Sequence, residues 1–167
     1  MEKLVEEVRQ WNTPSIGAYL LWQFTVGYCD SHPSGEAPVA LLHFLAIPLL
    51  TSQKLLAPIS NRRRNLQSYV KSFEDSQSTD ILIAIQDSAK NNRKYTMEAI
   101  DIAVSSGLLF WDAEAGMLYP RKDVKRPRRG NSLKPSLVKA GVKARILGGW
   151  FSEHSIPTVA TYLKVVL

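Results

Sequence analysis

The chain has 167 residues, 45% of them hydrophobic and 22% charged, which is the composition of an ordinary globular protein of one domain or two small ones. Its single cysteine, Cys29, excludes internal disulfides and a cysteine-rich zinc site, and suits a reducing cytoplasm. The most apolar stretch, residues 37–50, is shorter than the roughly 20 residues that a membrane-spanning helix needs. We therefore expect a soluble cytoplasmic protein that makes no membrane contact.

The net charge of +6 is concentrated in one region. Residues 121–145 contain ten Lys or Arg and one acid, a balance of +9, whereas the rest of the chain has 11 basic and 14 acidic residues, a balance of −3. Such a region favours binding to a polyanion, because each neutralised phosphate releases condensed counterions. A solvated basic loop explains the same pattern, and the sequence leaves both interpretations open.

The first half of the chain predicts helices with little polar surface. After a short amphipathic helix over residues 1–10, Pro14 suits the first turn of a helix that reaches residue 28 and is apolar nearly all round. Pro38 begins a second apolar helix, which Pro48 is expected to kink or end. A helix without a polar face lies either in the core or under a partner. The core is the commoner case, but in so small a chain a partner surface is a serious candidate.

Three adjacent arginines, Arg62, Arg63 and Arg64, precede a further predicted helix. The apolar residues of this helix fall at the spacing of one face: Leu66, Tyr69, Val70 and Phe73. Arginines at the start of a helix oppose its dipole. Either a partner carboxylate holds them there or they belong to an exposed turn, and both readings stay open.

Residues 79–130 follow the order of a winged helix. A helix over residues 80–90, with Ile81, Ile85, Ser88 and Ala89 on one face, is followed by a turn and by a second helix over residues 96–106. Thr96 is expected to cap this second helix, and the residues expected to face inward are Met97, Ile100, Ala103 and Val104. Gly107 suits the left-handed conformation that ends it. Residues 108–111 and 117–119 predict two short strands around a turn, which form the wing.

The charges of the predicted recognition helix argue against base-specific reading of DNA. This helix exposes Glu98, Asp101 and Ser105, and its acids repel phosphates. If nucleic acid is bound, we expect contacts to the backbone without sequence preference. The residues expected to make them are Arg121, Lys122, Lys125, Arg126, Arg128, Arg129, Lys139 and Lys143.

The C-terminal part predicts a helix over residues 137–151 in which Gly141, Ala144 and Gly148 share a face. Small residues at this spacing indicate close packing against another backbone. A last helix from Pro157 to residue 164 leaves an apolar tail. The expected fold is mainly α with a small β-hairpin: a winged-helix-like core with additional N- and C-terminal helices. Its parts are residues 1–78, 79–130 and 131–167, packed as one compact unit.

No catalytic set stands out in the sequence. His32, His43 and His154 lie far apart without metal-ligand spacing, and a histidine on an apolar face, such as His43, is typical of a hydrogen-bonded core residue. No Gly-x-Ser-x-Gly elbow is present, and the pair Gly148-Gly149 is not followed by the Lys of a phosphate-binding loop. We predict no catalytic residues, no metal site and no cofactor, and therefore no enzyme.

Two stretches resemble a known family. One is Trp-Asn-Thr-Pro-Ser-Ile-Gly-Ala at residues 11–18, which continues through Trp22 and Phe24 to Gly27 and Tyr28, and the other is Leu-Gly-Gly-Trp-Phe at residues 147–151. They resemble the middle component of bacterial three-component ABC systems, as in Lamassu-type operons. The likeness extends more loosely over the predicted hairpin. Members commonly finish with a Leu-Gly-Val-Arg-Pro-like end, whereas this chain ends in Leu-Lys-Val-Val-Leu.

The resemblance implies a non-catalytic adaptor in antiphage defence. In such systems a small subunit accompanies an SMC-like ABC ATPase and an effector, and couples the sensing of DNA ends or foreign DNA to an effector nuclease. The residues expected to contact partners are Trp11, Trp22, Phe24, Arg62, Arg63, Arg64, Trp150 and Phe151. The alternative is a stand-alone winged-helix transcriptional regulator, which requires a sequence-dependent affinity for DNA.

Overall fold

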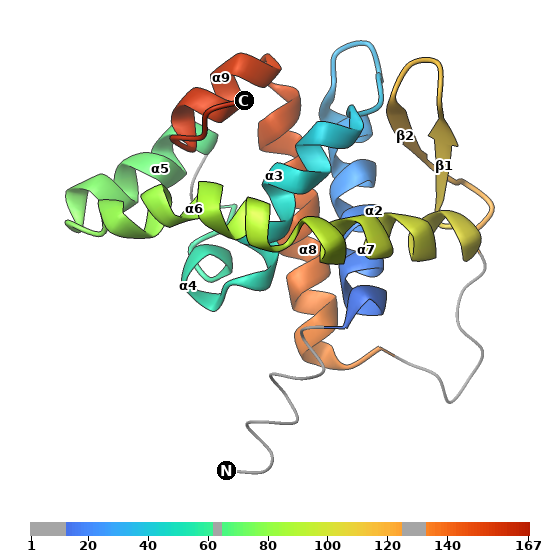
Figure 1. Ribbon diagram of the computed structural model, residues 1–167, viewed down its shortest axis with the longest axis horizontal. Helices are drawn as coiled ribbons and strands as arrows, with labels where there is room; N and C mark the ends of the chain where they lie inside the picture. The colour runs from blue at the N-terminus through green and yellow to red at the C-terminus, as the bar shows by residue number, and fades with distance from the viewer. Residues whose placement is uncertain (1–12, 62–64, 125–132) are drawn as a thin grey trace.

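The computed structural model describes residues 13–61, 65–124 and 133–167. The described chain is mainly helical with one two-stranded antiparallel sheet, which confirms the expected fold class (Figure 1). The helices are α2 (Pro14–Ser31), α3 (Ala40–Thr51), α4 (Gln53–Leu56), α5 (Leu66–Asp75), α6 (Thr79–Asn91), α7 (Arg93–Ser105), α8 (Pro135–Ser152) and α9 (Ile156–Tyr162), and the strands are β1 (Leu109–Asp112) and β2 (Met117–Pro120). The predicted helix over residues 1–10 lies outside the described residues, and the division into three parts stays a prediction.

The centre of the fold is a parallel pair of helices, α2 and α8, which lie side by side in Figure 1. Glycines make their close approach possible: Gly27 lies against the backbone carbonyl of Arg145, and Gly148 lies against that of Phe24. A Cβ at either glycine would come closer to these backbone atoms than the 3.0 Å below which real Cβ atoms are essentially never found. The prediction that small residues of the C-terminal helix face another backbone is therefore confirmed for Gly148, whereas Gly141 lies against the side chain of Tyr19.

Helix α2 is the central core helix. Leu20, Leu21 and Phe24 are fully buried, and α8, α7 and α3 all contact this helix. Of the two explanations for a helix without a polar face, the structure shows burial within the chain itself. A partner is not needed to cover it.

Helix α3 shows how the apolar second helix is accommodated. It continues past Pro48 to Thr51, so the proline lies inside the helix and does not end it. The missing proline N–H costs one hydrogen bond near the C-terminus of the helix, and burial of the ring and its neighbours outweighs this loss. The predicted one-face helix is also present as α5, which buries all four of its predicted apolar residues, Leu66, Tyr69, Val70 and Phe73.

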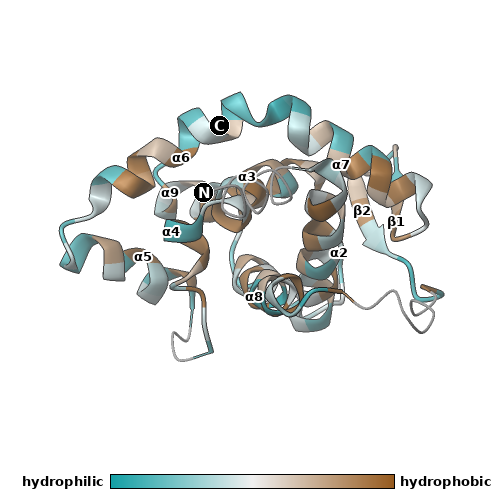
Figure 2. Ribbon diagram, turned by 90° about the horizontal axis from the view of Figure 1, so that it is seen from below, coloured by the Kyte–Doolittle hydropathy of each residue, from teal (hydrophilic) through white to brown (hydrophobic). Residues whose placement is uncertain are grey.

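Helices α6 and α7 run end to end across the molecule, with α5 at one end and the hairpin at the other (Figure 1), and they arch over α3 in the view of Figure 2. The predicted start of α7 was wrong: the helix begins at Arg93, and Thr96 is buried inside it. The Thr96 hydroxyl donates to the carbonyl of Asn92 (2.9 Å), a bond available to threonine within a helix. The prediction for Met97 was also wrong, because its side chain is 53% exposed.

The hairpin is attached to the rest of the fold by backbone hydrogen bonds. Gly107 has the predicted left-handed conformation (φ 76°) and ends α7, and β1 then pairs with β2 in register. The segment before α3 lies along the other edge of β2: the N–H of Ala40 donates to the carbonyl of Gly116 (2.9 Å), and the N–H of Leu118 donates to that of Pro38 (3.1 Å). The hairpin is thus fixed against α7 on one side and the start of α3 on the other. Its description as the wing of a winged helix stays a prediction.

A candidate partner-binding groove

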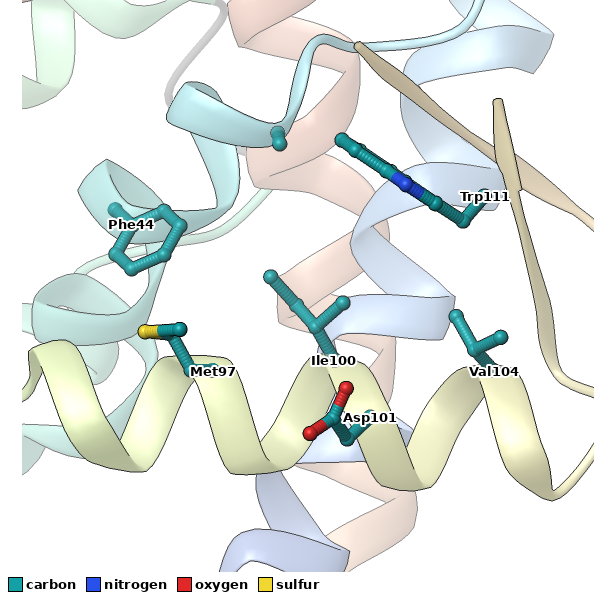
Figure 3. Close-up of a pocket in the computed structure, with 7 residues that line it drawn as sticks. Phe44, Met97, Ile100, Asp101, Val104 and Trp111 are labelled. Carbon is teal, nitrogen blue, oxygen red and sulfur yellow. The ribbon is translucent and has the colours of Figure 1, made fainter. Parts of the chain in front are cut away.

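An apolar groove of about 280 Å³ lies between α7, α3 and β1 (Figure 3). Successive turns of α7 form one wall through Met97, Ile100, Asp101 and Val104, because residues at these spacings share a helix face. The opposite side is formed by Ala40 and Phe44 of α3 and by Trp111 of β1. Figure 3 shows Phe44, Ile100 and Trp111 projecting into the space between the three elements.

The alternation of side chains along β1 explains why Trp111 reaches this groove. Leu109 and Trp111 lie on the face that is turned toward the body of the protein, where Leu109 and the cross-strand partner of Trp111, Leu118, are fully buried. Trp111 is closer to the tip of the hairpin and remains 42% exposed. Together with Met97 it leaves apolar surface open to solvent at the groove.

The groove has one charged group, the carboxylate of Asp101. This side chain is exposed, and no cation in the described part of the chain lies within ion-pair distance of it. The neighbouring Glu98, in contrast, is 3.9 Å from the ammonium of Lys94. A ligand for this groove therefore meets a largely apolar lining with a negative charge at one side.

The aromatic residues predicted to contact partners have other roles in this structure. Phe24, Trp150 and Phe151 belong to the core, and the rings of Phe24 and Phe151 pack edge to face with centroids 5.3 Å apart. Because these side chains are buried, they are not a docking surface, and the assignment is corrected. Trp22 is half-buried against Ala18, Leu109 and Leu118. The remaining residues of that prediction, Trp11 and Arg62, Arg63 and Arg64, lie outside the described residues.

The predicted phosphate-binding residues fall into three groups. Arg121, Lys122 and Lys139 are exposed, the first two directly after β2 and the third on α8. Lys143 is different: its ammonium donates to the carbonyls of Leu56 (3.4 Å), Ala57 (2.7 Å) and Ile59 (2.8 Å). Lys125, Arg126, Arg128 and Arg129 lie outside the described residues.

Lys143 is therefore better described as a structural residue than as a phosphate contact. Its ammonium joins α8 to carbonyls at the end of α4 and just after it, and partial burial lowers the pKa of the amine from its ordinary value. A cation that already binds three carbonyl oxygens has few donors left for a phosphate. The prediction that Lys143 contacts DNA is corrected on this ground.

The buried His43 behaves as the sequence predicts. Its Nε2 lies 2.9 Å from the hydroxyl of Thr25 and its Nδ1 lies 3.2 Å from the carbonyl of Val39. Desolvation lowers the pKa of this fully buried imidazole to about 4, so it is neutral at pH 7. His43 thus links α3, α2 and the segment beside the hairpin without a free ring nitrogen for a ligand.

In the described part of the chain, no three His, Cys, Asp or Glu side chains come together closely enough to hold a metal ion. Nor does any helix there combine the length and the apolar composition needed to cross a bilayer.

The chain is thus mainly helical in its described part, with an apolar groove that leaves Met97 and Trp111 partly open to solvent. The sequence comparison is specific: the model of the ABC-three component (ABC-3C) system Middle Component 3 family matches residues 1–167, and the chain belongs to this family. A middle component of a three-component system implies partner subunits. No curated protein and no solved structure matches the chain. The resemblance to a middle component is thereby confirmed, whereas the Lamassu assignment stays a prediction.

Proposed function

We propose that this chain is a non-catalytic adaptor that joins an SMC-like ABC ATPase to an effector nuclease in a cytoplasmic, Lamassu-type antiphage defence complex. Family membership supports the existence of partner subunits. The observation that carries the proposal is the open apolar groove between α7, α3 and β1, which displays Met97 and Trp111 to solvent. Apolar surface of this kind is stable in water only at a cost, which a bound partner removes.

The size of the groove favours a side chain from another protein over a metabolite. Its volume of about 280 Å³ lies just under the roughly 300–1,000 Å³ of small-molecule sites. One or two large apolar side chains fill such a space, as in the docking of an amphipathic helix into a groove. We assign this helix to the ATPase subunit.

Charge complementarity defines the occupant further. Because Asp101 has no cationic partner among the described residues, a Lys or Arg on the docking helix pairs with it. The partner helix therefore presents apolar residues at positions i and i+3 or i+4, with a basic residue beside them. A helix with an acid at that position is rejected by like-charge repulsion.

The test compares two exposed apolar residues on consecutive helices. Met97 in the groove is 53% exposed, and Ile83 on α6, which does not line the groove, is 61% exposed. Both Met97→Glu and Ile83→Glu should fold, since substitutions at exposed positions usually change stability by no more than about 0.5 kcal/mol. On co-expression with the ATPase encoded beside it, the wild-type protein and Ile83→Glu should copurify with the ATPase, and Met97→Glu should not. Equal capture of all three proteins, or of none, contradicts the proposal.

The second part of the proposed function is contact with the DNA backbone. Arg121, Lys122 and Lys139 are exposed cations in the segment that carries the excess of +9. The acids exposed on α7 argue against base reading by that helix, so we assign these cations to phosphates, without sequence preference. No observation favours the stand-alone regulator over this assignment.

Salt dependence tests the phosphate contacts. The variant Arg121→Glu/Lys122→Glu should bind duplex DNA more weakly, and its slope of log affinity against log salt should be shallower by roughly 2, about 0.9 for each lost contact. The affinity of the wild-type protein should be the same for duplexes of different sequence. An unchanged slope in the variant would remove these residues from the interface.

A further inference from the structure

The outer face of the hairpin carries an exposed aromatic pair. Phe110 of β1 and Tyr119 of β2 are directly opposite each other in the register of the sheet. Phe110 is 55% exposed and Tyr119 is 37% exposed. Because side chains alternate along a strand, both rings point away from the face that carries Leu109, Trp111 and the groove.

A cation lies on the same face, next to the rings. The N–H of Arg121 donates to the carbonyl of Leu108 (2.9 Å), which extends the β1–β2 pairing by one step. Arg121 is two residues beyond Tyr119 and therefore shares its side of the ribbon. Its side chain is exposed, and its Nε lies 3.7 Å from the carboxylate of Asp123, an ion pair too exposed to hold it firmly. Lys122 follows as a second exposed cation.

We propose that this outer hairpin face, formed by Phe110, Tyr119 and Arg121, binds single-stranded nucleic acid. Two unpaired bases stack on the two rings, and Arg121 and Lys122 contact the flanking phosphates. The inference rests on the proposed phosphate contact and makes it more specific, because a duplex hides the faces of its bases. Aromatic side chains on a sheet surface beside basic residues are suited to unpaired bases, since every base has a π-face.

Two features favour nucleic acid over a protein partner at this face. The rings lie directly before residues 121–145, whose charge balance is +9, whereas Asp101 is the only charged residue that lines the groove on the opposite side of the hairpin. Two acids lie on the same side of the ribbon and are already engaged: the carboxylate of Asp112 accepts the N–H groups of Glu114 (3.1 Å) and Ala115 (3.2 Å) within the turn, and that of Asp123 pairs with Arg121. The hairpin thus separates an exposed aromatic face, next to the start of the basic segment, from an apolar groove with one acid.

The test compares variants that lose the aromatic rings but keep apolar side chains with a variant that keeps both rings. In the full-length protein, Phe110→Leu/Tyr119→Leu removes both rings, and the exchanged variant Phe110→Tyr/Tyr119→Phe keeps both. Fluorescence anisotropy is measured with a single-stranded oligonucleotide of roughly 12 nucleotides and with a duplex of the same length. Thermal unfolding shows whether each variant is folded. If the double Leu variant does not fold, the single substitution Tyr119→Leu replaces it.

We expect the wild-type protein and the exchanged variant to bind the single strand more tightly than the duplex. The double Leu variant should lose at least about 10-fold in affinity for the single strand, and Tyr119→Leu about 5-fold or more, while duplex affinity stays within about 2-fold in each. An unchanged single-strand affinity in a folded Leu variant overturns the inference. If duplex binding still depends on Arg121 and Lys122 in that case, the proposed phosphate contact survives. Reduced capture of the ATPase by the double Leu variant, with unchanged nucleic-acid affinity, would assign this face to a protein and also overturn the inference.

Discussion

Two adjacent glycines of α8 give contrasting expectations for the same substitution. A Cβ at Gly148 would collide with the carbonyl of Phe24 and would lie 2.8 Å from the backbone N of Tyr28, both of which belong to α2. A Cβ at Gly149 would meet mainly the Ser31 hydroxyl oxygen at 3.0 Å, at the end of a side chain that can rotate. Only Gly148→Ala therefore forces two backbones apart.

The magnitude follows from the required movement. Ordinary contact begins at 3.4 Å, so α2 and α8 must separate by at least 0.6 Å to relieve the approach to Tyr28, and by more to clear Phe24. Overpacking of this kind costs typically 1–3 kcal/mol or more, and the rigid backbone places Gly148→Ala at the upper end. Even after the gain of about 1 kcal/mol for replacing glycine inside a helix, we expect a net loss of about 2 kcal/mol. For Gly149→Ala we expect no loss, and a gain of up to about 1 kcal/mol.

Thermal unfolding followed by circular dichroism measures the difference. For a chain of this size about 2 kcal/mol corresponds to a Tm lowered by roughly 4–8 °C, whereas Gly149→Ala should unfold at or slightly above the wild-type temperature. Equal Tm values for the two variants would refute the close packing of α2 against α8 and, with it, the described core.

Three further predictions concern other contacts of the fold and the groove. The free energy of unfolding should fall by up to roughly 3 kcal/mol as pH drops from 6.5 to 4, because the unfolded chain protonates His43 below its ordinary pKa of 6.5 and the folded chain only below about 4. The free energy of unfolding is measured by urea unfolding at several pH values in this range. In His43→Gln it should depend less on pH than in the wild-type protein, and an equal pH dependence would contradict a neutral buried imidazole. Lys143→Met should lower the free energy of unfolding by about 2 kcal/mol and leave DNA affinity unchanged. Lys139→Met should lower DNA affinity and leave the free energy of unfolding unchanged. Asp101→Lys should weaken binding of the ATPase subunit, and Asp87→Lys, a matched exposed position on α6, should not; equal effects in a binding titration would remove Asp101 from the interface.

The elements that local sequence determines were predictable. Proline at the first turn marks α2, one-face spacing marks α5, and Gly107 marks the end of α7, because backbone geometry and amphipathic period act within a few residues. The glycine face of α8 also predicted close packing, since glycine otherwise only weakens a helix.

The pairing of elements was not predictable in the same way. Whether the aromatic residues Phe24, Trp150 and Phe151 form a core or a surface depends on which helix lies against which, and a single sequence does not contain that information. Lys143 could not be told from the neighbouring basic residues, because the carbonyls that it binds are more than 80 residues away in the chain.

The groove was missed for a related reason. Met97 has the spacing of an inward-facing residue, but it lines the groove and is 53% exposed. Phe44 and Trp111 complete the groove from parts of the chain that are far from α7 in sequence. The signal available in the sequence was an apolar face on α7 that is wider than the line of buried residues Thr96, Ala99 and Ala103.

Amide hydrogen exchange can show whether a partner subunit occupies the groove between α7, α3 and β1. Exchange is compared for the protein alone and in complex with the ATPase encoded beside it. We expect slower exchange on binding in residues 97–104, 40–44 and 109–112, with little change in α5 and α6. Slower exchange confined to α5 and α6, with the groove segments unchanged, would contradict occupation of the groove.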